Sequence, residues 1–202
     1  IVKPFKNNFK LFQGQVDFSG SIGIHQKKVF GEGVLTQSEG MFTSSEFAFT
    51  SNNWKVNEAK LQIGKNMKLF KPAVFAEKIA AESDLKLKRI TLHATSNQTG
   101  EEQIIFPNLA YQSKGLEAIW DIESRHFRLF SKKGFELTAW QEDTSQIESD
   151  TLPKQLHGST GNKGLILAKS ADYDLKQEVL LLGGVEHVSI GPAMIYPFKG
   201  NF

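Results

Sequence analysis

The 202-residue chain has no cysteine, and only three of its 24 basic residues are arginine. The absence of cysteine excludes disulfides, thiolate metal sites and a cysteine nucleophile. The basic residues are nearly balanced by 22 acidic ones, whereas proteins that bind nucleic acid carry a basic surface and favour the forked guanidinium group. The composition therefore argues against nucleic acid as a partner.

Long apolar runs are also missing. The longest, VLLLGGV at Val179 to Val185, is far shorter than the roughly 18 residues that a membrane helix needs. We therefore expect contact with a membrane to be peripheral only. The chain begins IVKPF, without methionine or a secretion signal, so we expect it to derive from a longer or processed precursor.

Patterns typical of catalytic and metal sites are absent as well. The five histidines show neither H-x-H nor H-E-x-x-H spacing. The glycine-rich stretch at 158–164 lacks the phosphate-binding pattern and precedes a strand-like segment where that pattern requires a helix. No G-x-S-x-G motif of serine hydrolases occurs. We predict a non-enzymatic protein without catalytic residues, metal or cofactor.

What the chain has is phenylalanine, 16 residues in all, most of them in short runs where apolar and polar residues alternate. This period of two is typical of β-strands. Polar clusters at 25–28 and 51–53 predict hairpin turns, and Gly31 and Gly33 predict bulges or a close approach of two backbones. A slip in the alternation predicts a further bulge at 57–58.

One segment, 72–83, has a different pattern. Pro72 suits the first turn of a helix, the following residues are rich in alanine, and Lys78 and Glu82 have i,i+4 spacing. We predict a short helix here that covers a strand edge, with a lid over a ligand groove as the alternative. The stretch 142–164 has no periodicity and is predicted to be a surface loop.

Two stretches share a pattern, AIWDIESRHFRLF at 118–130 and ADYDLKQEVLLL at 171–182. In each, an aromatic residue is followed two positions later by an aliphatic one, so that both lie on one face of a predicted strand. These pairs are Trp120 with Ile122 and Tyr173 with Leu175. A fainter copy is FAFTSNNWKV at 47–56.

The residues between the paired ones are Asp121 and Asp174, and each precedes a predicted turn. Two carboxylates could act as the acid and base of a glycosidase. Because they occupy equivalent places in two repeats, we favour a structural role, in which each carboxylate accepts hydrogen bonds from the backbone of its turn.

A hairpin is not stable alone in water, so the copies are expected to stack and share one core. The predicted fold is mainly β, an elongated open β-roll or jelly roll of stacked antiparallel hairpins, with one short helix near residues 72–83. We expect residues 1–202 to form a single β-rich domain, or two stacked halves, 1–70 and 85–202, joined by that helix.

The stretch ADYDLKQEVLLLGGVEHVSIGPAMIYP at 171–197 resembles the strand pattern of the OstA-like β-jellyroll family of periplasmic lipopolysaccharide-transport domains. The Gly183–Gly184 pair departs from the single glycine of that pattern. The resemblance implies a twisted sheet folded over an apolar groove, which carries acyl chains or docks end to end with like domains. The matching residues are Ala171, Tyr173, Asp174, Leu180, Leu182, Val185 and Ala193.

The leading hypothesis is therefore a non-enzymatic module of the periplasm or cell envelope. It would bind or conduct lipid or lipopolysaccharide acyl chains, or scaffold envelope assembly, through an apolar β-groove. The alternative is a carbohydrate-binding or carbohydrate-active β-sandwich that uses Trp54 or Trp140 with the two aspartates. The residues expected to line the groove are Phe47, Phe49, Trp120, Ile122, Tyr173 and Leu175.

Overall fold

A computed structural model describes residues 7–64, 72–94, 103–114, 117–140, 164–190 and 193–197. Within these ranges the protein is built from β-strands, with only two short 3-10 helices, η1 (Phe12–Gly14) and η2 (Pro107–Leu109). The predicted β class is thus confirmed. The strands are β1 (Asn7–Leu11), β2 (Val16–His25), β3 (Lys28–Gln37), β4 (Gly40–Phe49), β5 (Trp54–Ile63), β6 (Val74–Asp84), β7 (Arg89–Ala94), β8 (Gln103–Phe106), β9 (Tyr111–Lys114), β10 (Glu117–Asp121), β11 (His126–Ala139), β12 (Leu165–Asp174), β13 (Val179–Gly183), β14 (His187–Ile190) and β15 (Ala193–Ile195).

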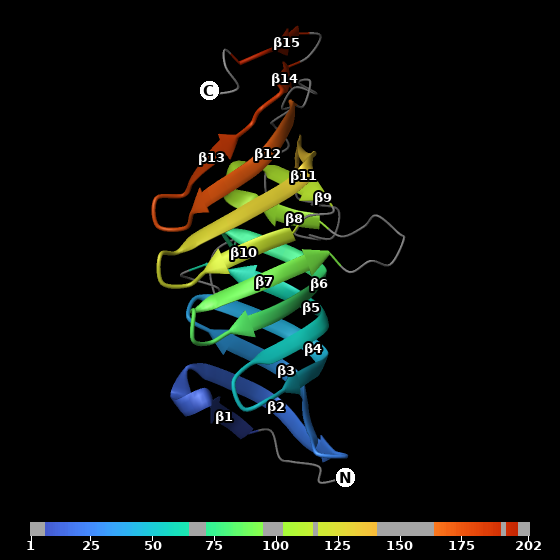
Figure 1. Cartoon of the computed structure of the whole chain (residues 1–202), viewed down its shortest axis with the longest axis vertical. Coiled ribbons are helices and arrows are strands. Elements are labelled where there is room, and N and C mark those ends of the chain that lie inside the picture. The colour runs from blue at the N-terminus through green and yellow to red at the C-terminus, as the bar shows by residue number, and fades with distance from the viewer. Residues whose placement is uncertain are drawn as a thin grey trace, which may run out of the picture.

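The strands form one continuous antiparallel sheet, in which β1 to β7 pair in chain order and are followed by β10, β11 and β12. A side path from β6 through β8 and β9 to β11 closes a six-stranded barrel in the middle of the chain. Strands β1 to β5 extend from one side of this barrel and β12 to β15 from the other. The strands are stacked along the long axis, with the two termini at opposite ends (Figure 1).

The predicted helix at 72–83 is wrong, because this segment is strand β6. Its buried residues alternate with exposed ones except at Glu77 and Lys78, which are both exposed, and Lys78 has a φ of 53°. This interruption gives the apolar residues a spacing that resembles a helical period. Pairing with β5 on one side and β7 and β8 on the other outweighs the helix propensity of the alanines. Instead of a helix joining two halves, β6 is a central strand of the sheet.

The predicted hairpin turns are confirmed. Gln26 and Lys27 connect β2 to β3, and both have positive φ, as the tightest hairpin turns require. The chain also turns between β4 and β5, where the Thr50 backbone N–H donates to the Asn53 carbonyl at 3.0 Å. These turns fix the registers of the two N-terminal hairpins.

Both predicted bulges are present. The pairing of β3 with β4 shifts between Gly31 and Gly33, and the pairing of β5 with β6 shifts between Val56 and Ala59. Gly33 has a φ of 148°, and a Cβ atom there would lie 2.2 Å from the carbonyl oxygen of Ser19. Glycine is therefore required where β2 and β3 approach most closely.

The repeated hairpin occurs three times in the structure. The copies predicted at 118–130 and 171–182 form β10–β11 and β12–β13, and β6–β7 contains a further copy, AESDLKLKRITL at 81–92. All three have alanine first, aspartate fourth, an aliphatic residue fifth and leucine twelfth. The third copy was not predicted, because its first strand lies in the segment that was predicted to be a helix.

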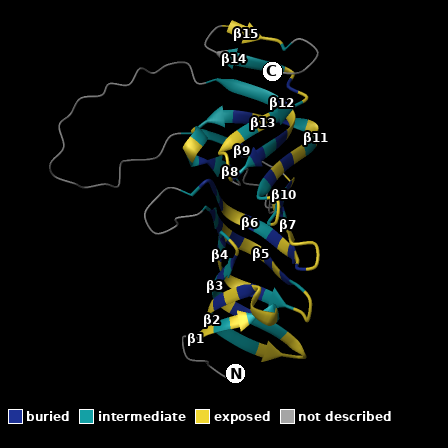
Figure 2. Cartoon of the chain, turned by 90° about the vertical axis from the view of Figure 1, so that its left-hand side faces the viewer, coloured by how far each residue is buried: buried dark blue, intermediate teal, exposed yellow. Residues whose placement is uncertain are grey.

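The copies stack in register. Trp120 lies opposite Phe127 across β10 and β11, and Phe127 lies opposite Tyr173 across β11 and β12. Trp120 and Tyr173 are both completely buried. Their side chains belong to one core that runs from β2 to beyond β12, and buried and exposed positions alternate along the central strands (Figure 2). The repeat therefore marks equivalent layers of a shared core.

Candidate apolar site at the N-terminal end

The six residues predicted to line a groove are mostly part of the filled core. Phe47, Trp120 and Tyr173 have no exposed surface, and Leu175 is 5% exposed. Phe49 and Ile122 are partly buried and pack against the same core. The structure places Phe47 and Phe49 near the N-terminal end of the stack and the other four in the repeated hairpins, so the six do not surround one cavity.

Neighbouring side chains occupy the space beside these residues. The Phe106 ring packs edge to face against the rings of Tyr173 and Phe127, with centroid distances of 5.4 and 6.2 Å. The Trp54 ring lies 6.3 Å from that of Phe47, and its Nε1–H donates to Gln37 Oε1 at 2.9 Å. A ligand could not reach these positions without displacing core side chains.

Apolar side chains come to the surface at the N-terminal end of the sheet. Phe9, Phe12 and Phe49 are partly exposed there. Phe9 and Phe49 contact the buried rings of Phe18 and Phe47, and Phe12 contacts Phe49. We call these five residues the phenylalanine cluster. Its ring centroids are 6.4 Å apart for Phe9–Phe18, 6.5 Å for Phe12–Phe49, 5.3 Å for Phe18–Phe49 and 6.1 Å for Phe47–Phe49.

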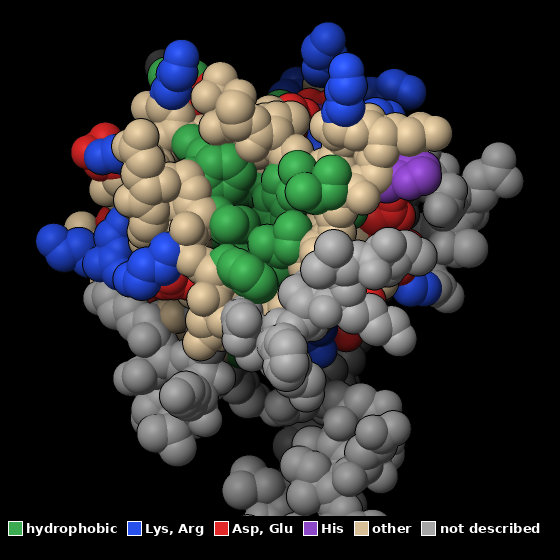
Figure 3. Space-filling model, turned by 90° about the horizontal axis from the view of Figure 1, so that it is seen from below, with side chains coloured by type: hydrophobic (Ala, Val, Ile, Leu, Met, Phe, Trp, Pro, Cys, Tyr) green, Lys and Arg blue, Asp and Glu red, His purple; other side chains and the backbone are tan. Residues whose placement is uncertain are grey.

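The end view shows apolar side chains gathered at the centre of this face, with basic side chains at several places around the rim (Figure 3). Leu11 and Ile22 are also partly exposed and pack against the core at this end of the chain. Ile24, at the end of β2, is 77% exposed. The apolar core therefore continues to the surface here.

Gly31 makes room for the phenylalanine cluster. A Cβ atom on Gly31 would lie 2.7 Å from the Phe49 ring and 2.8 Å from the Phe18 ring, well inside van der Waals contact. These two rings occupy the space that a side chain at position 31 would fill. Gly31 was predicted as a site of close approach, but between two backbones rather than between a backbone and aromatic rings.

A depression of about 270 Å³ lies beside the cluster. Its lining combines Phe12 from η1 with Leu85 and Lys86 from the turn between β6 and β7, and the remaining lining residues are polar. An apolar ring and an ammonium group thus lie on the same concave surface. Sequence reasoning missed Phe9, Phe12 and Lys86; the density of phenylalanine in the first 50 residues was the available signal.

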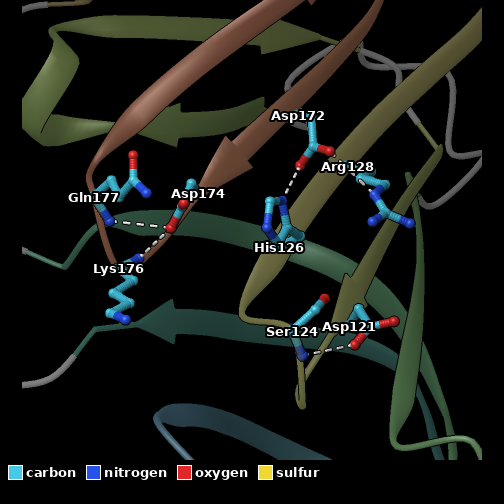
Figure 4. Close-up of polar contacts among 8 residues, drawn as sticks. All are labelled: Asp121, Ser124, His126, Arg128, Asp172, Asp174, Lys176 and Gln177. Carbon is cyan, nitrogen blue, oxygen red and sulfur yellow. Dashed lines mark hydrogen bonds and ion pairs between the residues drawn. The ribbon is translucent and has the colours of Figure 1, made fainter.

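The two repeated aspartates bind their own turns, as predicted (Figure 4). Asp121 Oδ1 accepts the Ser124 backbone N–H at 3.0 Å. Asp174 Oδ1 accepts the backbone N–H groups of Lys176 and Gln177 at 2.8 and 3.0 Å. These backbone donors are the main reason why the pKa of each carboxyl lies below its ordinary value.

Asp84 plays the same part in the third copy, where it accepts the backbone N–H groups of residues 86 and 87. The carboxylates are therefore structural parts of a repeated turn. Each one accepts the backbone donors of its own hairpin turn.

A small charged cluster lies on the outer face of the repeats. His126 Nδ1 is 2.7 Å from Asp172 Oδ1, and Arg128 Nε donates to Asp172 Oδ2 at 3.2 Å (Figure 4). All three side chains are substantially exposed. The cluster joins β11 to β12, and Asp174 lies opposite His126 beside it. Exposed ion pairs of this kind contribute little to stability.

Two further depressions are lined mainly by polar residues. One of about 530 Å³ lies over the bulges of β4, β5 and β6, and its lining includes three glutamates and two lysines. Among the residues that the structure describes, no three histidine or acidic side chains are grouped closely enough to hold a metal ion. The described part of the chain also has no helix with the length and apolar character needed to cross a membrane.

The stretch 142–164, predicted to be a surface loop, lies outside the described residues except for Gly164. Trp140, which the carbohydrate alternative would use to bind a sugar, is partly buried. Comparison with protein-family models found no match to this chain. Searches of curated proteins and of solved structures found no match either.

Proposed function

We propose that this protein is a non-enzymatic module of the periplasm or cell envelope, which binds an acyl chain of lipid or lipopolysaccharide at its N-terminal end. The observation that supports this most directly is the phenylalanine cluster. Its rings run without interruption from the buried core to a partly exposed surface. Large apolar side chains that remain accessible together are typical of sites for apolar ligands or partners.

The end of the stack suits this role better than its interior. In the interior, the residues first expected to line a groove are closely packed, and exposing them would cost much of the core. At the N-terminal end, Phe12 and Phe49 are already partly exposed, so an acyl chain can lie against them while the core stays packed. Each Å² of apolar surface removed from water would contribute about 25 cal/mol, before the cost of ordering the ligand.

The charge beside the cluster favours a ligand with an anionic headgroup. Lys86 shares a depression with Phe12, and basic side chains lie around the rim of the face (Figure 3). A lipid phosphate or carboxylate could bind Lys86 while its chain lies on the rings. Both parts of an amphipathic ligand therefore have a counterpart in the protein.

Outside the closed six-stranded barrel, the finer architecture that we propose is an elongated open roll of stacked hairpins, in which the ends of the sheet are available for ligands or assembly. Antiparallel stacking along one long axis supports this proposal (Figure 1). No observation favours the carbohydrate alternative. The ring of Trp54 is completely buried and cannot stack on a sugar, and Trp140 is partly buried. The two aspartates proposed as acid and base accept backbone hydrogen bonds in their turns.

A fluorescent fatty-acid probe tests the proposal. We expect the wild-type chain to bind the probe and Phe12→Asp to weaken binding about tenfold. The substitution removes the apolar contact between the ring and the acyl chain, and it adds a negative charge that repels the carboxylate of the probe. Phe130→Asp is the matched control, since Phe130 is 36% exposed on β11 and lies outside the cluster. Trp120→Asp is unsuitable, because a carboxylate at this buried position would unfold the protein.

Lys86→Glu separates the two parts of the site. It should weaken binding of the anionic probe and leave binding of a neutral acylglycerol probe unchanged. If the wild-type chain binds neither probe, or if Phe12→Asp and Phe130→Asp weaken binding equally, the proposal is wrong.

A further inference from the structure

Strand β13 has a free edge, whereas the second strands of the other two repeats, β7 and β11, are paired on both sides. Strand β13 pairs with β12 on one side, and no described strand pairs with its other side. Its sequence, VLLLG, contains no charged residue, and Val179 and Leu181 are 44% and 66% exposed. Edges of this kind recruit further strands unless they are protected.

The opposite end of the sheet is better protected. Edge strand β1 carries Lys10 and two asparagines, and its chain turns away into the 3-10 helix η1. Charged residues and interruptions are devices by which proteins block pairing at an edge. Strand β13 carries no charged residue, so its edge lacks the first of these devices.

Two edges equivalent to that of β13 are each covered by another strand in this structure. Strand β13 is the second strand of its repeat, as β7 and β11 are of theirs. The free side of β7 is covered by β10, and that of β11 is covered by β12. Both covering strands are first strands of the next repeat, with the pattern Ala-x-aromatic-Asp followed by an aliphatic residue.

The covering strands bind in the same register. Leu92 lies opposite Ala118, and Ile90 lies opposite Trp120. In the next layer, Leu129 lies opposite Ala171, and Phe127 opposite Tyr173. On β13 the corresponding residues are Leu182 and Leu180, which would face the alanine and the aromatic residue of an added strand.

In both layers a backbone hydrogen bond also joins the turn of one repeat to the turn of the next. The Ile122 N–H donates to the Lys88 carbonyl at 3.0 Å, and the Leu175 N–H donates to the Arg125 carbonyl at 3.0 Å. Both acceptors belong to the last residue of a turn, with φ of 52° and 62°. Glu178 is the equivalent residue in the third turn, with φ of 58°, and no described turn residue donates to its carbonyl.

We propose that the edge formed by Glu178 and β13 docks one more strand with the pattern Ala-x-aromatic-Asp-aliphatic, supplied by another polypeptide. The alanine lies opposite Leu182, the aromatic residue opposite Leu180, and the N–H after the aspartate donates to the Glu178 carbonyl. This goes beyond acyl-chain binding and does not depend on it.

The residue between the alanine and the aromatic one sets specificity. In the added strand it lies opposite Leu181, whose exposed side chain favours an apolar neighbour. Strand β10 has Ile119 at this place and β12 has Asp172, so a partner resembling β10 fits better. A second folded copy of the chain cannot supply such a strand, because β6, β10 and β12 are already paired on both sides.

A labelled peptide with the sequence of residues 116–130, LEAIWDIESRHFRLF, tests the proposal by fluorescence anisotropy with the full chain. We expect saturable binding, and hydrogen exchange of the amides at 179–183 should slow when the peptide is present. The Ile119→Asp form of the peptide should bind about tenfold more weakly, because an apolar cross-strand contact is replaced by a charge.

Matched protein variants locate the site. Leu181→Lys should weaken peptide binding about tenfold, whereas Leu87→Lys, at a residue 61% exposed in the turn between β6 and β7, should not. Phe12→Asp should leave peptide binding unchanged, so a failure of this inference differs from a failure of acyl-chain binding.

Three results would overturn the inference. The first is equal weakening of peptide binding by the two lysine variants. The second is slow exchange at 179–183 before peptide is added, which would mean that the edge is already covered. The third is dimerisation of the chain alone that Leu181→Lys abolishes, which would assign the edge to a second copy.

Discussion

Gly40 lies directly against the indole ring of Trp120. A Cβ atom on Gly40 would come within 2.3 Å of Cζ3 and 2.4 Å of Cη2 of that ring. Gly40 begins β4, and Trp120 lies in β10, so this contact joins the N-terminal hairpins to the repeated ones across the core. Beside it, the Arg125 guanidinium donates to both carboxylate oxygens of Glu39.

Gly40→Ala should therefore destabilise the fold. The methyl group cannot be accommodated without moving a completely buried tryptophan, and overpacking of this kind costs about 1–3 kcal/mol. Urea unfolding monitored by circular dichroism measures the change. Gly23→Ala is the control, because no atom lies within 4 Å of its Cβ position, and equal losses for both variants would contradict the contact.

The pair formed by Glu39 and Arg125 should contribute more than the surface ion pairs. Glu39→Gln leaves a half-buried guanidinium without its charged partner, and we expect a loss of about 1–3 kcal/mol in the free energy of unfolding. The exposed pair of Lys88 and Glu123 provides the comparison, where Glu123→Gln should change stability by less than about 0.5 kcal/mol. A loss no greater for Glu39→Gln would be inconsistent with this ranking.

The turn carboxylates should make stability depend on pH in the acid range. The Ser124 N–H holds the pKa of Asp121 below its ordinary value of 3.8, so the ionised form is favoured in the folded state. Its stabilisation is present above pH 3.8 and is lost as the pH falls through the lower folded-state pKa. Urea midpoints of the wild type and Asp121→Asn should differ most near neutral pH and converge in acid. A difference that stays constant would contradict this role.

The hydroxyl of Tyr173 should be dispensable for folding. Its oxygen has no hydrogen-bond partner among the described residues, and burial is the main cause that raises its pKa to about 12, with the Asn108 side chain acting in the opposite direction. Because the folded state already carries the cost of the unpaired hydroxyl, Tyr173→Phe should be neutral or stabilise the protein by up to about 1 kcal/mol. Tyr173→Ala should cost about 3–5 kcal/mol through the cavity that it creates. A clear loss for Tyr173→Phe would reveal a hidden partner.

Much of the strand plan was predictable from the sequence. Alternation predicted the hairpins, and the slip at 57–58 and the glycines of β3 predicted real bulges, because a one-residue shift exchanges the faces of a strand. The aspartate turns followed from their equivalent places in two repeats. The alternation failed in β6, where the interruption at Lys78 gave a strand the apparent period of a helix.

The site was harder to predict for a different reason. Alternation shows that Trp120 and Tyr173 lie on an apolar face, but whether a neighbouring side chain or a ligand fills the space beside that face depends on distant residues. The backbone at Gly40 fills this space beside Trp120, and the Phe106 ring fills it beside Tyr173. In each case the two residues in contact are far apart in the sequence. Phe12 was not predicted as a site residue, and it lies in the short helix η1 that follows β1.

The most direct test of the proposed function is native mass spectrometry of the full chain after expression in a bacterium with an outer membrane. We predict that the wild-type protein retains an acyl lipid, that Phe12→Asp loses it, and that Phe130→Asp keeps it. Wild-type protein free of lipid, both as purified and after incubation with lipopolysaccharide or phospholipid, would contradict the proposal that the phenylalanine cluster binds an acyl chain.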